Sequence, residues 1–208
     1  MKLSWEGVLE DFSDLETANL PEDAVKFNEP NTFKEYMRLT EKFAILIIII
    51  FIIICFLIIF IKKQAGLILN FPNINEVISL RVVLLVFLSI IPHELLHAIC
   101  FPKDAEVQIW RIPKQAMFVY STYPISKRRF IIIVLLPCII FAFIPFIFWV
   151  FMPESSLSNY ILGFSFFSLI ISSGDLLNVF NIITQMPKNS MAQSSGLNSY
   201  WFIPKKNN

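Results

Sequence analysis

Two histidines and a glutamate have the clearest potential for chemistry in this chain. They stand in the run His93-Glu94-Leu95-Leu96-His97, and the sequence contains no other histidine. Residues four apart on an α-helix lie on one face, about one turn from each other, so both imidazoles can reach one metal ion. Glu94 can then reach a water on that ion and act as a general base. This H-E-x-x-H spacing therefore predicts a hydrolytic zinc site with His93 and His97 as ligands.

The surroundings of the motif bear on its interpretation. Leu95, Leu96, Ala98 and Ile99 are uncharged, and the motif lies inside a long apolar run. A charged carboxylate in the middle of a membrane costs about 2.5–3.5 kcal/mol on insertion scales, so ionisable groups there are usually functional. The alternative is an ion pair or hydrogen-bonded cluster that only joins helices.

The composition of the whole chain is that of a membrane protein. Apolar residues make up 56% of the 208 residues, and 22 of them are phenylalanine, which together favour membrane spans over a soluble globule. The net charge of +1 gives no support for a nucleic-acid partner. Cys55, Cys100 and Cys138 all lie in apolar runs, so we expect packed thiols and no cysteine zinc site.

Four apolar stretches are long enough to cross a bilayer. The sequence therefore predicts an all-α membrane protein with about four transmembrane helices, at residues 43–61, 77–101, 130–152 and 159–183. The second helix carries the histidines near its end. Pro92 directly precedes them and removes one backbone hydrogen bond, which is expected to kink or widen the helix and admit water.

The remaining segments give the predicted domain organisation. Residues 1–42 are polar and acid-rich and form an N-terminal arm, residues 43–183 form the four-span membrane domain with the zinc site, and residues 184–208 form a polar tail. In the 102–129 loop, VQIW and AMFVYST are strand-like and are joined by RIPKQ, which predicts a short β-hairpin. Its exposed edge would hold an extended substrate by strand addition, or the hairpin would only cap the bundle.

The basic residues predict the orientation in the membrane. With four spans, the segments 1–42, 102–129 and 184–208 share one side and carry five, six and three Lys or Arg residues. The opposite side carries only Lys62 and Lys63 outside the spans. Because cytoplasmic loops are enriched in positive charge, we expect a multi-pass protein of the cell membrane with both termini in the cytoplasm.

A catalytic zinc needs a third protein ligand and an open position for water. Both histidines of the chain are already assigned as ligands, so the third ligand should be an acidic residue. A metzincin would have a histidine at the position of Lys103, so that class is excluded. Asp104 and Glu106 lie just past the helix end, and Glu154 lies on the opposite side of the membrane. Asp175 remains, at roughly 12 Å from the cytoplasmic end of its own span, against roughly 6–12 Å for the two histidines.

Asn178 follows Asp175 by three residues and lies on the same helix face. Its side chain would orient that carboxylate or bind a substrate carbonyl. The alternative is an interhelical hydrogen bond. Gly174, directly before Asp175, allows a neighbouring helix to approach closely.

Three segments resemble one known family: HELLHAICFP, YSTYPISKRRFIIIVLLP and SSGDLLNVFNIITQMPKNSMAQSSGLNSYW. They are similar to small bacterial multi-pass membrane proteins described as zincin peptidases, whose function is unknown and whose layout is similar to that of site-2 intramembrane metalloproteases. In site-2 proteases an H-E-x-x-H helix pairs with an aspartate of a later span, within N-x-x-P-x-x-x-L-D-G. His93, Glu94 and His97 match the first element. Asp175 matches the second in a Gly-Asp-Leu-Leu-Asn setting that lacks the Asp-Gly pair, and the resemblance implies peptidase activity.

These observations predict a membrane-embedded zinc metallopeptidase with its site near the cytoplasmic face. Zinc lowers the pKa of its bound water, and Glu94 accepts the proton and passes it to the leaving amine. The expected partners are the lipid bilayer and a membrane-associated or transmembrane peptide substrate, and no pattern points to a particular oligomeric state. Two alternatives stay open: a metal-dependent membrane hydrolase of another substrate, and a non-catalytic receptor or immunity-type protein. Glu94 argues against the second, because binding alone needs no base.

Overall fold

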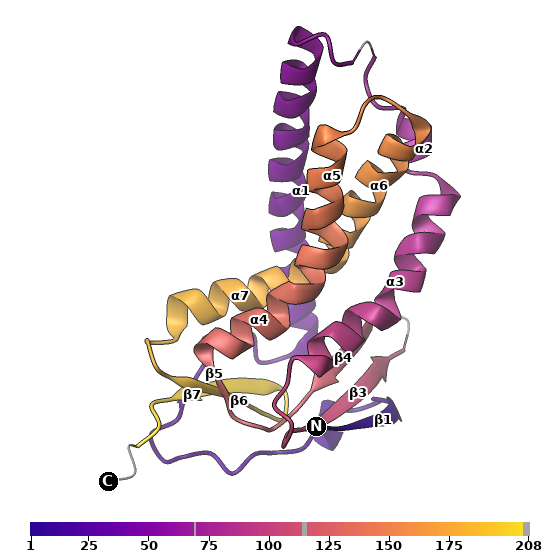
Figure 1. The fold of residues 1–208 in the computed structure, drawn as a ribbon. Coiled ribbons are helices and arrows are strands. Elements are labelled where there is room, and N and C mark those ends of the chain that lie inside the picture. Colours follow the sequence, from indigo (N-terminus) through magenta and orange to yellow (C-terminus); the bar gives the residue numbers. More distant parts are fainter. Residues whose placement is uncertain (69, 114–115, 206–208) are drawn as a thin grey trace. The chain divides into compact units, whose positions relative to one another are not determined.

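The computed structural model describes residues 1–68, 70–113 and 116–205 (Figure 1). Helices dominate the chain, and strands occur near both ends and in the middle. The elements are β1 (Lys2–Val8), the 3₁₀ turn η1 (Phe12–Asp14), β2 (Val25–Lys26), α1 (Phe33–Gln64), α2 (Ile74–Val77), α3 (Leu80–Ile99), β3 (Glu106–Ile112), β4 (Ala116–Tyr120), β5 (Ile125–Ser126), α4 (Lys127–Cys138), the π-helical turn η2 (Ile139–Phe143), α5 (Ile144–Phe151), α6 (Ser156–Ile171), α7 (Ser173–Gln185), β6 (Met191–Ser195) and β7 (Asn198–Phe202).

Several helices have the length and apolar character of membrane spans. Three stretches of the described residues qualify: Phe33–Gln64, Ile74–Ile99 and Lys127–Phe151. The pair α6 and α7 makes a fourth if it is one span. These stretches agree with a multi-pass membrane protein, and α1 begins ten residues before the apolar run because the charged segment ahead of it is also helical.

The chain forms two compact units. The first contains Met1–Leu39, Glu94–Leu136 and Leu176–Asn208, and the second contains Thr40–His93 and Pro137–Asp175. All strands of the described residues belong to the first unit. The helices α1, α3, α4 and α7 each contain residues of both units.

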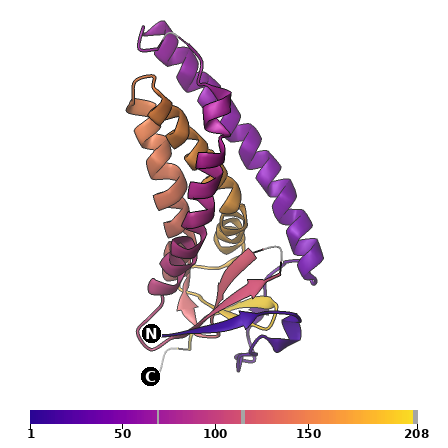
Figure 2. The same cartoon turned by 90° about the vertical axis from the view of Figure 1, so that its right-hand side faces the viewer.

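Two sheets make up the strand part of the first unit. One has the order β1-β3-β4 and the other the order β2-β7-β6-β5. β3 and β4 pair antiparallel with Ile109 opposite Val119, within the segment where the sequence predicted a hairpin. β1 adds to β3 in parallel, and Figure 2 shows this indigo strand beside the pink strands of the pair.

The sheets add strands to the all-α prediction, which had included only one short β-hairpin. Residues 1–42 contain β1 and β2, and residues 184–208 contain β6 and β7, strands that the sequence did not predict. β2 and β5 are two residues long, too short for any alternation of apolar residues to mark them. β2 also pairs with β7, where Val25 lies opposite Trp201, and such distant pairing leaves no local signal.

In the first unit, α4 and α7 pack on the four-stranded sheet. Val179 and Ile182 of α7 and Met186, directly after its last residue, recur at helical spacing and are buried. They form one apolar cluster with Phe27, Ile125, Ile133, Val134 and Ala192. This cluster holds the middle of α4 in place, including the backbone around Ile133.

The second unit is built around α6, which packs against α2, η2 and α5. Gly163 of α6 permits the contact with α2, because a Cβ there would lie 2.0 Å from the carbonyl oxygen of Val77. Ser165 of the same helix donates a hydrogen bond of 2.8 Å to the Ala142 carbonyl in η2. Lys62, at the end of α1, donates to the Met152 carbonyl at 2.8 Å, just past the C-terminus of α5, where a positive charge is favoured.

The predicted fourth span is not one straight helix. α6 and α7 are bent by 54° relative to each other. The break lies at Ser172-Ser173-Gly174, and serine and glycine pairs are a common cause of such bends. The depth that we assigned to Asp175 by counting residues along one span assumed an unbroken helix, and this assumption does not hold. Asp175 instead lies in the first turn of α7, where the positive end of the helix dipole favours a carboxylate.

Candidate metal centre

The helix α3 carries both histidines near its C-terminal end. It runs unbroken through Pro92, so His93 and His97 are separated by one helical turn and lie on one face. Their exposed fractions are 6% and 8%, so both imidazoles are buried. The His93 ring also stacks on Phe141 of η2, with 6.4 Å between ring centroids and 17° between planes, which limits its rotation.

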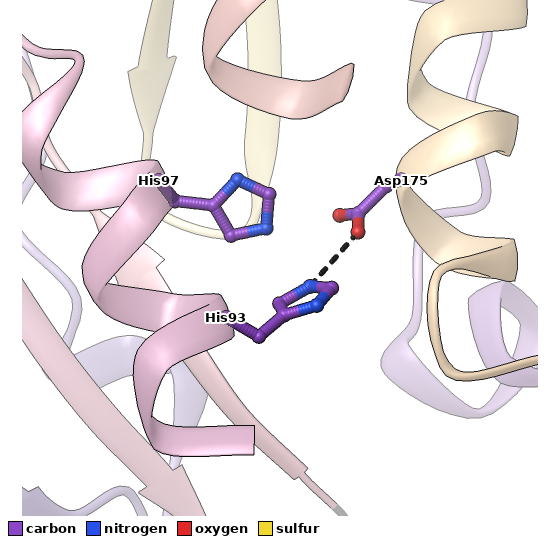
Figure 3. A group of neighbouring side chains, drawn as sticks. All are labelled: His93, His97 and Asp175. Carbon is purple, nitrogen blue, oxygen red and sulfur yellow. Dashed lines mark hydrogen bonds and ion pairs between the residues drawn. The ribbon is translucent and has the colours of Figure 1, made fainter. Parts of the chain in front are cut away.

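Asp175 joins the two histidines. Its Oδ2 atom lies 3.1 Å from Nε2 of His93. The ligand atoms that His93, His97 and Asp175 offer all lie within 4.8 Å of one another, and the three side chains point toward one another in Figure 3. No second group of three or more His, Cys, Asp or Glu residues with this spacing occurs in the part of the chain that the structure describes.

The other acidic residues that the sequence analysis considered as a third ligand are exposed or have different partners. Glu106 is exposed and pairs with Lys2 at 3.0 Å across the β1–β3 edge. Glu154 accepts a hydrogen bond of 3.2 Å from the Asn70 amide. Asp104 is exposed in the turn that precedes β3. Asp175 is thus the acid that the structure brings to the histidines.

The donor set fits zinc. Two imidazole nitrogens and one carboxylate oxygen, with a fourth position for water, are typical of catalytic zinc sites. Bonds of about 2.0–2.1 Å in tetrahedral geometry place two ligand atoms about 3.3 Å apart, close to the 3.1 Å between His93 and Asp175. All the separations among the three ligand atoms are within 4.8 Å.

The tautomer of His97 is set by a backbone carbonyl. Its Nδ1 atom lies 2.7 Å from the carbonyl oxygen of Ile133 in α4. A carbonyl can only accept, so Nδ1 carries the proton and Nε2 carries the lone pair that a metal ion requires. Metal-binding histidines usually donate their second ring nitrogen in this way. Sequence patterns gave no sign of Ile133, because it contributes only backbone.

Glu94 and Asn178 are the remaining two residues that the sequence predicted for the site. Glu94 is buried, with an exposed fraction of 8%, and follows His93 directly on α3. Asn178, one turn after Asp175 on α7, accepts a hydrogen bond of 3.1 Å at Oδ1 from the Tyr36 hydroxyl of α1. The interhelical hydrogen bond that we considered as the alternative role of Asn178 is therefore present. Because this bond uses the amide oxygen, the amide N–H groups of Asn178 are the donors for a carboxylate or a carbonyl. Tyr36 was not predicted, since nothing distinguishes it within its charged helical segment.

Comparison with known proteins agrees with this geometry. The profile of the family described as "Putative zincin peptidase" matches residues 86–191, which contain the H-E-x-x-H motif, Ile133 and Asp175. The chain belongs to this family. No curated protein and no solved structure matches the chain. Membership of this zincin family confirms the resemblance seen in the sequence, and the family's description favours a metallopeptidase with zinc as its ion.

Proposed function

We propose that the protein is a membrane-embedded zinc metallopeptidase that hydrolyses a peptide bond near the cytoplasmic face of the membrane. The observation that carries this proposal is the convergence of His93, His97 and Asp175 within 4.8 Å, next to the buried Glu94. Membership of the zincin family and the apolar helices support the same conclusion. A non-catalytic receptor would need neither the metal ligands nor a buried carboxylate beside them.

The proposed roles follow from the position of each side chain. His93, His97 and Asp175 would hold the ion, and zinc supplies a Lewis acid that polarises a peptide carbonyl and makes water acidic. Glu94 accepts the proton of the attacking water and delivers it to the leaving amine. The Ile133 carbonyl keeps the His97 proton on Nδ1, and Phe141 restricts the His93 ring.

The proposed substrate is a membrane-associated or transmembrane peptide in an extended conformation. Support comes from β4, which ends the sheet order β1-β3-β4 and has one paired neighbour among the described strands. Its second edge offers backbone groups to which an extended peptide can pair, the mode called strand addition. This supports the substrate-holding interpretation of the 102–129 segment over a simple cap.

Removing the ion should abolish activity. Purified protein in detergent micelles, incubated with a mixture of membrane-derived peptides, is expected to produce new cleavage sites detectable by mass spectrometry. A chelator such as 1,10-phenanthroline should stop cleavage, and added zinc should restore it, because the proposed Lewis acid cannot be replaced by a side chain. Cleavage that persists in a zinc-depleted sample would refute the zinc mechanism.

The orientation gives a second expected result. Reporter fusions after Lys63 and within residues 153–158 should report the outer side of the membrane, and fusions after Lys127 and after Asn208 the cytoplasm. The reason is the excess of Lys and Arg in the segments 1–42, 102–129 and 184–208. The reversed pattern would move the proposed site to the outer face.

A further inference from the structure

We propose that Pro137 is a positioning residue for the metal site. By lacking a backbone N–H, it leaves the Ile133 carbonyl to accept the hydrogen bond of His97, and this bond sets the tautomer of the imidazole. The inference rests on the proposed function, because the tautomer matters only if His97 binds a metal ion. An internal proline in a membrane helix is otherwise expected only to kink the helix.

The helical hydrogen-bond pattern identifies the missing donor. In an α-helix the carbonyl of each residue accepts from the N–H four residues later. For Ile133 that residue is Pro137, which lies inside α4 and has no N–H to donate. His97 Nδ1 lies 2.7 Å from this same oxygen. The histidine thus supplies the donor that proline withholds.

Burial makes this replacement consequential. Pro137 is among the fully buried side chains, and the hydrogen bond to Ile133 is itself buried. A buried carbonyl without a donor is costly, so the ring N–H is held at Ile133 and the Nε2 lone pair faces the remaining ligands. An alanine at position 137 would return the N–H and compete for the same oxygen. The imidazole would then be free to rotate or to change tautomer.

Internal prolines elsewhere in the chain provide a comparison. Pro145 lies at the start of α5, on the far side of the π-helical turn η2 from α4. Pro145 also lacks an N–H, and it follows the π-helical turn in which the Ile144 N–H bonds the Ile139 carbonyl. If both prolines only bend the helix, replacing either one should affect His97 to the same extent. If Pro137 positions His97, only the substitution at residue 137 should change the His97 ring.

The first test measures the tautomer in zinc-free protein. The chain has only two histidines, so ¹⁵N-histidine NMR resolves both rings, and a His93→Gln variant assigns them. Wild-type His97 is expected as the Nδ1–H form. Pro137→Ala should lower the population of that form, whereas Pro145→Ala should leave it unchanged. An unchanged His97 tautomer in Pro137→Ala would overturn the inference, whether or not zinc binds.

The second test measures zinc affinity by competition with a chelating dye. Pro137→Ala should bind zinc about 10–100-fold more weakly, the usual effect of losing a partner behind a metal ligand. Pro145→Ala should bind as the wild type does. Thermal unfolding of the zinc-free variants checks that both remain folded, and the unfolding midpoint of Pro137→Ala reports the lost volume of the buried ring together with the returned N–H.

A backbone variant separates the missing N–H from the packing of the ring. Incorporating the α-hydroxy analogue of alanine at position 137 keeps the small side chain of Pro137→Ala but again provides no N–H. Near-wild-type zinc affinity in this variant would support the inference. Equal loss of affinity in both variants would assign the effect to ring packing and overturn it. If the wild type binds no zinc, the metal site itself is refuted. If the wild type and Pro137→Ala bind zinc equally well, the metal site stands and the role of Pro137 is refuted.

Discussion

Glu94→Gln is expected to abolish peptide cleavage while the protein still binds zinc. Glutamine has nearly the shape of glutamate but cannot accept a proton at neutral pH, so it removes the base alone. Loss of a positioned general base typically lowers turnover about 10²–10⁴-fold. Because Glu94 is not proposed as a ligand, the zinc content should match that of the wild type. Cleavage is measured by mass spectrometry of membrane-derived peptides, and zinc by elemental analysis of the same samples.

A matched substitution controls for the change of charge. Glu106→Gln removes a carboxylate from the exposed pair with Lys2 and should cleave at the wild-type rate. If Glu94→Gln cleaves as fast as Glu106→Gln, the proposed mechanism is wrong. If Glu94→Gln instead loses its zinc, the glutamate is a ligand and the roles of Glu94 and Asp175 need exchanging.

Asp175→Ala should be nearly free of zinc after dialysis that leaves the wild type loaded. It removes one of three proposed protein ligands, which should weaken binding more than the about 10–100-fold expected for loss of an orienting partner. The matched controls are Asp104→Ala, Glu106→Ala and Glu154→Ala, which remove the acids that the structure places elsewhere. These three should retain zinc. An empty Asp104→Ala or Glu106→Ala beside a loaded Asp175→Ala would move the third ligand to the segment that follows α3.

Two further variants distinguish ligand loss from unfolding. Asp175→His keeps a group that can bind zinc and should retain part of the metal, whereas an unfolded protein would retain none. Asn178→Ala should fall between the wild type and Asp175→Ala if its amide orients the carboxylate. If Asn178 serves only the hydrogen bond with Tyr36, zinc affinity should stay at the wild-type value.

The sequence revealed those residues of the site that lie close together along the chain in a regular pattern. His93, Glu94 and His97 are defined by helical periodicity, and α3 supplies the helix that this periodicity requires. Asp175 was chosen by eliminating other acids. The structure brings it to the histidines, although the depth argument behind the choice fails at the bend between α6 and α7. Its role as a ligand stays a prediction until zinc binding is measured.

The features that the sequence did not reveal depend on distant partners or on backbone atoms. β2 and β5 have two residues each and form only through pairing with β7 and β6. The hydrogen bonds from Tyr36 to Asn178 and from His97 to the Ile133 carbonyl join residues 142 and 36 positions apart. No pattern of residue types encodes such contacts, because each needs a second segment at a fixed position. Pro137 was visible as an internal proline, but only the position of His97 gives it a meaning.

The zinc content of the purified wild-type protein tests the central claim most directly. Protein prepared without chelators and without added metal should contain about one zinc per chain, the stoichiometry of a single two-histidine, one-carboxylate site. The His93→Ala/His97→Ala double variant, purified in parallel, should contain almost none. A folded wild-type protein that holds no more zinc than this double variant, even after incubation with zinc, would contradict the account.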